Sequence, residues 1–276
     1  MSIFDEPKVD CHCHVLDPAR FAYADGVAYR PAGQEVGTLA QYVDVMQAYG
    51  VRHALLVGPN SGYGLDNRCL LDAIAHGEGR FKGIAVVRND ASRDELQQLK
   101  AAGIVGVAFN PNLNGTAYYA NTAPLLRHLA ELDMFIQVQV ERDQLVDLLP
   151  LLKNSGARIL VDHCGRPAPR AGLAQPGFAA LLALGRSGRA AVKLSGYQKF
   201  SDEPAPHHDA LPFVHALIDA LTLDACVWAS DWPFLKATQR LDYGPLLTQL
   251  QALLPDAVER RKLLWDTPRR WFGFDQ

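Results

Sequence analysis

The sequence lacks the features that mark several special classes of protein. No apolar run approaches the length of a membrane-spanning helix, and residues 1–7 do not combine a basic segment with an apolar one, as a secretory leader would. A net charge of -3 and a pI near 6.3 give no general basic field for nucleic acid. We therefore expect a cytoplasmic protein with neither a membrane nor a nucleic-acid partner.

Cysteine is scarce, and its distribution excludes two further classes. The five cysteines are odd in number and scattered, which is typical of free thiols and not of a disulfide framework. Cys11 and Cys13 are separated by a single residue, closer than the usual spacing in a structural zinc site. The cysteines therefore predict neither cross-links nor a zinc ribbon.

Linkers and nucleotide-binding turns are also missing. The chain has no stretch rich in Gly or Ser, no low-complexity tract and no Gly-x-Gly-x-x-Gly turn after its first predicted strand. Its 276 residues, 49% hydrophobic and 21% charged, have an ordinary globular composition. We expect one domain over residues 1–276.

Short β-rich runs alternate with amphipathic runs of helical length along the whole chain. The predicted strands begin at Val9 and continue with 54–57, 81–87, 106–109, 135–139, 158–162, 191–194 and 226–229. The predicted helices start near Thr38, Asn67, Ser92, Pro124, Gln144 and Phe213. Strict alternation requires parallel strands, and a count near eight favours a single (β/α)8 TIM barrel over an open doubly wound sheet, the second choice.

The first strand ends by presenting two histidines on one side. Side chains alternate faces along a strand, so His12 and His14 point together. Two neighbouring imidazoles can share a metal ion or hold a developing oxyanion. They can also simply pack on a sheet, so the pair gains meaning only from polar residues at other strand ends.

Polar side chains do occur at or near the end of every predicted strand, where a barrel places its chemistry. Each alone has a structural explanation: Asn110 can satisfy a loop backbone, Gln137 can fill a layer, and Lys193 can pair with a carboxylate. Together they form the candidate site, which comprises His12, His14, Asn60, Ser61, Arg88, Asn110, Gln137, His163, Arg166, Lys193, Tyr197 and Asp231.

Three motifs carry a resemblance to a known family. Residues 9–14 (VDCHCH), 161–167 (VDHCGRP) and 228–233 (WASDWP) resemble the first-, sixth- and eighth-strand motifs of the amidohydrolase-related TIM-barrel enzymes. Within that family, residues 66–72 (DNRCLLD) and 107–110 (VAFN) are similar to the branch that contains 2-pyrone-4,6-dicarboxylate lactonase. The resemblance covers nearly the whole chain.

The resemblance implies a hydrolase that opens the lactone ring of a small organic acid. It implies that Asp231 is the general base toward water, with His12, His14 and His163 around the carbonyl oxygen. The residues expected to bind substrate are Asn60, Ser61, Arg88, Asn110, Gln137, Arg166, Lys193 and Tyr197. One departure concerns Ala108, where the dicarboxylate enzymes typically carry Arg, and the loop 111–115 supplies no second cation. A monocarboxylate or hydroxylated lactone fits equally well.

Two alternatives stand beside the lactonase, and no particular oligomeric state is predicted. Other branches of the family are zinc-dependent decarboxylases or hydrolases, and here His12, His14, His163 and Asp231 would be the ligands. Gln137 and Gln139 are weak ligands where such enzymes need stronger ones, so we expect no metal to be required. A barrel that only binds its ligand is a remote third choice, because Asp231 and all three histidines are present.

Overall fold

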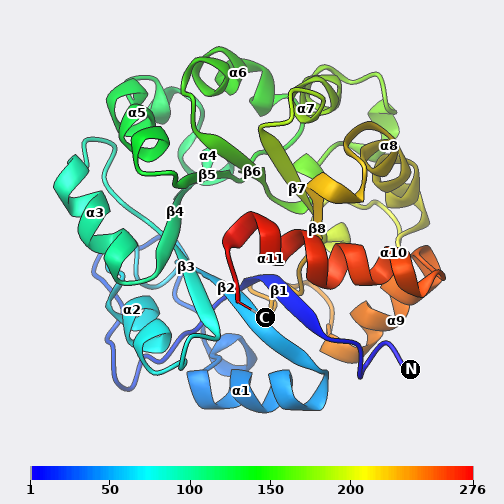
Figure 1. The fold of residues 1–276 in the computed structure, drawn as a ribbon, viewed down its shortest axis with the longest axis horizontal. Coiled ribbons are helices and arrows are strands. Elements are labelled where there is room, and N and C mark those ends of the chain that lie inside the picture. The colour runs from blue at the N-terminus through cyan, green and yellow to red at the C-terminus, as the bar shows by residue number, and fades with distance from the viewer. Residues whose placement is uncertain (1, 276) are drawn as a thin grey trace. The chain divides into compact units, whose positions relative to one another are not determined.

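The computed structural model describes residues 2–275, in which the strands and helices alternate along the chain (Figure 1). Within this range eight strands form one sheet in the order β1 to β8. A sequential order is that of a (β/α)8 barrel, whereas a doubly wound sheet reverses its order at a switch point. The barrel prediction is confirmed, and the open-sheet alternative is wrong.

The described chain divides into two compact units, which we call unit 1 (residues 2–86 and 228–275) and unit 2 (residues 87–227). Unit 1 contains, in chain order, β1 Lys8–Cys13, α1 Leu39–Ala48, β2 Val51–Val57, α2 Arg68–Ala75, β3 Phe81–Ala85, α9 Tyr243–Leu253, α10 Ala257–Arg261 and α11 Thr267–Phe272. The last two helices are joined by a π-helical turn, Lys262–Asp266.

In unit 1 the strands pair in parallel and every residue of β1 is buried. The capping predicted for α1 is confirmed: the Thr38 side chain accepts from the Gln41 backbone N–H while the Gln41 side chain accepts from that of Thr38. Gly50, with a φ of 67°, follows the helix and allows the immediate turn into β2. Helix α1 contacts β2 and α2 contacts β3 (Figure 1).

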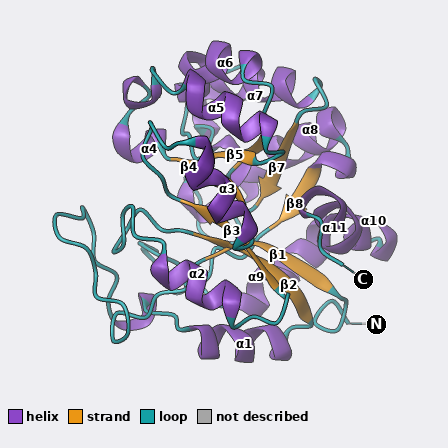
Figure 2. Ribbon diagram, turned by 60° about the vertical axis from the view of Figure 1, so that its left-hand side comes forward, coloured by secondary structure: helices purple, strands orange, loops and turns teal. Residues whose placement is uncertain are grey.

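Unit 2 continues the alternation of strands and helices. Its elements are α3 Arg93–Ala101, β4 Ile104–Phe109, α4 Pro111–Asn114, α5 Ala123–Glu131, β5 Phe135–Val138, α6 Gln144–Asn154, β6 Arg158–Val161, α7 Pro176–Gly185, β7 Ala190–Leu194, α8 Leu211–Leu221 and β8 Cys226–Trp228, whose last residue belongs to unit 1. Strands β4 to β7 pair in parallel, and α5, α7 and α8 contact β5 and β7 from outside (Figure 2).

Several strands end one or two residues earlier than the sequence predicts. The third was expected to reach Val87 but stops at Ala85, because the Asn67 side chain bonds both backbone groups of Val86, at 3.0 Å to its N–H and 2.8 Å to its carbonyl. The sixth stops at Val161, because Asp162 leads into a tight turn. At the end of β3 a polar side chain thus satisfies the backbone groups of the first residue beyond the ladder.

No helix in the part of the chain that the structure describes has the length and apolar character needed to cross a membrane.

Candidate active site

The predicted pairing of the two histidines is confirmed in unit 1. The rings of His12 and His14 lie edge to face with centroids 4.9 Å apart. Their Nε2 atoms lie 3.7 and 3.8 Å from the same oxygen, Oδ1 of Asp231. All three side chains are buried, with Asp231 only 2% exposed. One carboxylate and two imidazoles therefore converge on a common point in a poorly solvated site.

Backbone hydrogen bonds hold the end of β1 against the segment after β8. The Asp231 N–H donates to the His12 carbonyl at 2.8 Å, and the His14 N–H donates to the Trp232 carbonyl at 2.8 Å. Asp231 has a φ of 64°, a left-handed conformation that costs a residue with a side chain about 1–2 kcal/mol. Such strain at a functional side chain persists only where the surroundings fix it.

His14 is oriented by a bond on the far side of its ring. Its Nδ1 lies 2.8 Å from the carbonyl oxygen of Val57, so Nδ1 carries the proton and Nε2 faces Asp231. This is the arrangement by which proteins orient a histidine that binds a metal or polarises a substrate.

The donors in unit 1 fit a metal ion. One ligand atom from each of His12, His14 and Asp231 lies within 4.8 Å of the others. The spacings to Asp231 approach the roughly 3.4 Å that separates two ligands about 2.0–2.1 Å from a tetrahedral zinc. His163 belongs to unit 2, so its place in the predicted ligand set stays a prediction.

In unit 2 a buried charge cluster lies beneath the end of β6. The Lys193 ammonium is 2.9 Å from Oδ1 of Asp162 and donates to the side-chain amide oxygen Oε1 of Gln137 at 2.7 Å. The Gln137 amide donates to Oδ2 of Asp162 at 2.9 Å. All three are at most 2% exposed. Lys193 and Gln137 thus have the structural roles that the sequence left open, and their predicted contact with substrate stays a prediction.

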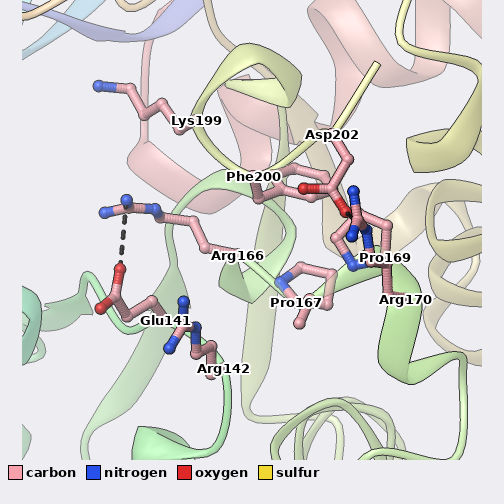
Figure 3. Close-up of a pocket in the computed structure, with 10 residues that line it drawn as sticks. Glu141, Arg142, Arg166, Pro167, Pro169, Arg170, Lys199, Phe200 and Asp202 are labelled. Carbon is pink, nitrogen blue, oxygen red and sulfur yellow. Dashed lines mark hydrogen bonds and ion pairs between the residues drawn. The ribbon is translucent and has the colours of Figure 1, made fainter.

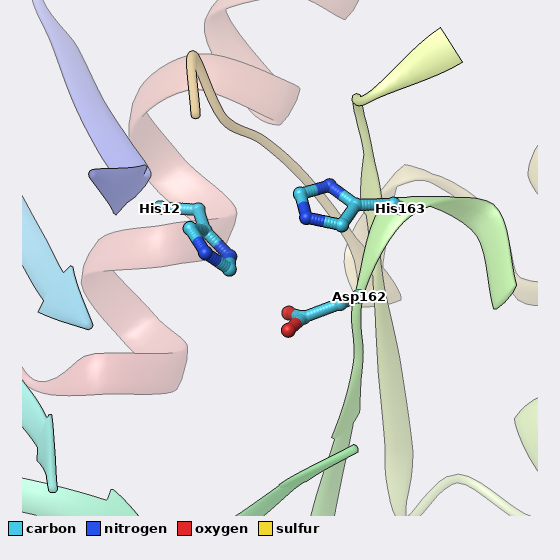
Figure 4. A group of neighbouring side chains, drawn as sticks. All are labelled: His12, Asp162 and His163. Atoms are coloured by element: carbon cyan, nitrogen blue, oxygen red, sulfur yellow. The ribbon is translucent and has the colours of Figure 1, made fainter. Parts of the chain in front are cut away.

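His163 follows Asp162 and begins a turn of four residues with positive φ, at 49°, 57°, 72° and 46° for His163, Cys164, Gly165 and Arg166. Only one of them is glycine, so the turn is strained. The Gly165 and Arg166 N–H groups close it on the carbonyls of Asp162 and His163, each at 2.9 Å. Figure 4 shows the Asp162 carboxylate and the His163 imidazole projecting from consecutive residues after β6. Nδ1 of His163 lies 3.1 Å from the Ser195 hydroxyl.

A cavity of about 430 Å³ opens beside this turn (Figure 3). Four cationic and two acidic residues are among those that line it: Arg142, Arg166, Arg170, Lys199, Glu141 and Asp202. Arg166 pairs with Glu141 at 3.4 Å and Arg170 with Asp202 at 2.9 Å. The excess of cations makes this cavity suited to an anionic group.

The other predicted substrate-binding residues have varied surroundings. Arg88 is 62% exposed and paired with Asp90 at 3.1 Å. Asn110 caps α4 through a bond from the Leu113 N–H, which is the structural role allowed for it. Asn60 and Ser61 lie half-buried in the loop after β2, and Tyr197 is buried after β7, where burial raises its pKa well above the usual value. Contact of these five residues with substrate stays a prediction.

Asp10, Asp162 and Lys199 are among the residues near these sites that were missed in the sequence. Asp10 shares the face of β1 with His12, and a charge among buried strand residues was the available signal. Asp162 offered the same signal at the end of β6. Lys199 lies in a short 3-10 turn after β7, and nothing in the local pattern distinguishes it from a surface lysine.

Comparison with known proteins agrees with this geometry. Residues 9–274 match the family model described as amidohydrolase. The 4-sulfomuconolactone hydrolase of Rhizobium radiobacter is 32% identical over 271 residues, which cover 96% of this chain and 89% of that protein. The 2-pyrone-4,6-dicarboxylate hydrolase of Comamonas testosteroni is 27% identical over 277 residues, with 96% and 89% covered. A Pseudomonas putida crystal structure, described as a candidate 2-pyrone-4,6-dicarboxylic acid hydrolase, has a TM-score of 0.86 at 30% identity and 100% coverage of both chains.

Proposed function

The chain belongs to the amidohydrolase family, and from this premise we propose that it hydrolyses the lactone ring of a small organic acid carrying an anionic substituent. The observation that carries the proposal is the convergence of His12 and His14 on Asp231 in a buried site. Relatives that act on lactones, at 27–32% identity over nearly the whole chain, support the choice of substrate class.

In this proposal Asp231 is the general base. Its carboxylate removes a proton from water as the water oxygen bonds to the lactone carbonyl carbon, and it returns the proton to the ring oxygen as that C–O bond breaks. His12 donates a hydrogen bond to the carbonyl oxygen as negative charge develops there. His14, whose Nδ1 proton is bonded to the Val57 carbonyl, donates through Nε2 only in its doubly protonated form. The role expected for His163 at the carbonyl oxygen stays a prediction. One such donor typically contributes about 2.7–4 kcal/mol of transition-state stabilisation.

A metal would be held by His12, His14 and Asp231. A bound zinc would supply a polarised carbonyl and a water of lowered pKa. We nevertheless propose that turnover requires no metal, because Gln137, in the position where a stronger ligand is expected, is committed to Lys193 and Asp162. Dialysis against a chelator should leave kcat unchanged, whereas loss of turnover restored by zinc would favour the metal-dependent alternative.

The anionic substituent is proposed to bind in the cation-rich cavity of unit 2, through Arg166 and Lys199. Carboxylate and sulfonate oxygens both accept paired N–H bonds from a guanidinium. Ala108 lies on β4 where the dicarboxylate enzymes typically carry Arg, and its methyl group makes no such bond. A single strong anion therefore suits the chain better than two carboxylates.

A panel of lactones tests the proposal. We expect kcat/KM to be highest on a lactone with one sulfonate or carboxylate, lower on 2-pyrone-4,6-dicarboxylate, and lowest on an uncharged lactone. Ala108→Arg should raise kcat/KM on the dicarboxylate by about 10- to 100-fold, the value of one charge-assisted contact. If no lactone in the panel is opened faster by the wild type than by Asp231→Asn, the proposed function is wrong.

The remaining expectations stay predictions. We propose that the two units act as one domain, and the match of one family model to residues 9–274 supports this. The cytoplasmic location is likewise proposed. The substrate is a small molecule, as for the lactone hydrolases among the relatives.

A further inference from the structure

A second carboxylate, Asp10, lies fully buried in unit 1 and takes no part in the proposed reaction. Five donors surround it. The backbone N–H groups of Ser230 and His12 donate to Oδ1 at 2.9 and 3.3 Å. The hydroxyls of Ser230, Tyr42 and Tyr243 donate to Oδ2 at 2.5, 2.9 and 3.0 Å. None of these donors is a cation, which is unusual for a buried carboxylate.

The same bonds reach both chain neighbours of Asp231. Ser230 donates to Asp10 through its N–H and its hydroxyl. The hydroxyl oxygen of Ser230 also accepts from the Trp232 N–H at 3.0 Å. Both chain neighbours of Asp231 are therefore joined to Asp10: Ser230 by its own hydrogen bonds, and Trp232 through the Ser230 hydroxyl. The N–H of His12, which lies on β1 two residues after Asp10, donates to the same carboxylate.

The backbone of Asp231 needs such support. Its φ of 64° is left-handed, and L residues leave that region when nothing holds them. Rotation back to negative φ would swing the carboxylate away from the two imidazoles that it faces at 3.7 and 3.8 Å.

We propose that Asp10, with the Tyr42 and Tyr243 hydroxyls, is a positioning group that keeps Asp231 in its left-handed conformation and aligned with His12. This inference rests on the proposed function for its kinetic consequences, but its geometric consequence does not. Tyr42 comes from α1 and Tyr243 from α9, so two helices outside the strands fix the base through one carboxylate.

Burial holds the pKa of both tyrosines well above the usual value, so their hydroxyls remain hydrogen-bond donors to Asp10. If Asp10 served only the stability of the fold, Asp10→Asn would change the free energy of unfolding and leave kcat near the wild-type value. If Asp10 positions Asp231, Asp10→Asn lowers kcat.

The kinetic test uses Asp10→Asn, Tyr243→Phe and the Tyr42→Phe/Tyr243→Phe double variant. We expect kcat on the preferred lactone to fall roughly 10- to 100-fold in Asp10→Asn and 2- to 10-fold in Tyr243→Phe, with KM within twofold of the wild type. Tyr49→Phe is the matched control, because Tyr49 stacks on Tyr243 but its hydroxyl does not bond Asp10. Met46→Ala, at a buried position of α1, is the control for lost packing.

Two outcomes would overturn the proposal: kcat within twofold of the wild type in Asp10→Asn and in the tyrosine double variant, or an equal loss of kcat in Met46→Ala at matched thermal stability. If Asp10→Asn does not fold, the tyrosine variants decide.

The geometric readout needs no substrate. Crystal structures of the wild type, Asp10→Asn and the tyrosine double variant should show Asp231 leaving positive φ, or adopting two conformations, only in the variants. An unmoved Asp231 in both variants would overturn the proposal. If the wild type opens no lactone, the proposed function fails while this readout still decides the role of Asp10.

Discussion

Each unit has one buried carboxylate next to its candidate site residues, Asp10 in unit 1 and Asp162 in unit 2. The two carboxylates accept hydrogen bonds from different kinds of donor. In unit 1 Asp10 accepts only from uncharged hydroxyl and N–H groups. In unit 2 Asp162 is paired with the Lys193 ammonium. A hydrogen bond from an uncharged donor to a charged group is worth about 1.5–3 kcal/mol, whereas breaking a buried ion pair costs about 3–5 kcal/mol. Unit 1 should therefore tolerate the loss of single donors better than unit 2 does.

The two units also differ in what they present. Unit 1 offers a carboxylate base and two imidazoles, the groups that move protons. Unit 2 offers His163 and a cavity rich in cations, which suit the recognition of an anion. Both contain left-handed residues at these positions, Asp231 in unit 1 and the turn 163–166 in unit 2. Under the proposed function, proton transfer is therefore the task of unit 1 and anion recognition the task of unit 2.

The largest expected effect is on the base of unit 1. Asp231→Asn keeps the shape of the side chain and removes its proton acceptor, so kcat should fall roughly 100- to 10,000-fold. Cys13→Ser, at a buried thiol of the same strand end, is the control and should be mild. Steady-state kinetics on the preferred lactone checks this. A kcat near the wild-type value in Asp231→Asn would show that Asp231 is not the proton acceptor.

The next effect is on stability in unit 2. Lys193→Met leaves Asp162 buried without its ammonium, and the free energy of unfolding should drop by about 3–5 kcal/mol. Lys153→Met, at an exposed lysine of α6, should change it by less than about 0.5 kcal/mol. Urea unfolding measures both. If Lys193→Met lowers the free energy of unfolding no more than Tyr243→Phe does, the two carboxylates do not differ in how much they depend on a single donor.

A smaller effect concerns Lys8 at the start of β1. Its ammonium donates to the carbonyls of Glu6 and Tyr49 at 2.5 Å each, and burial lowers its pKa to about 8. Between about pH 8 and the usual 10.5 the unfolded state then binds more protons than the folded state. The wild type should gain stability relative to Lys8→Met as the pH rises through this window, by at most about 1.4 kcal/mol per pH unit. Unfolding curves of the two proteins across this range test it, and a constant difference would contradict it.

The sequence predicts the fold well because alternation of period-2 and helical segments is a local signal. It also predicts the pairing of His12 with His14 and the placement of Asp231 beside them, since parallel strands end on one face of a barrel. The partners of Asp10 could not be predicted, because 233 residues separate it from Tyr243. The turn 163–166 was equally hidden, since only Gly165 among its four residues favours positive φ. Position after a strand is not enough to predict a site residue, as Arg88 shows. It follows a predicted strand, yet its side chain forms an exposed ion pair with Asp90.

The division between the units is tested most directly with one pair of substrates and two variants. The substrates are a lactone with a single carboxylate and its neutral methyl ester. We predict that Arg166→Gln lowers kcat/KM on the charged lactone by about 10- to 100-fold and leaves the ester unchanged, because only the anion uses the guanidinium. Asp231→Asn should lower kcat/KM on both substrates by the same factor. Equal losses on both lactones in Arg166→Gln, or a loss confined to the charged lactone in Asp231→Asn, would contradict the account.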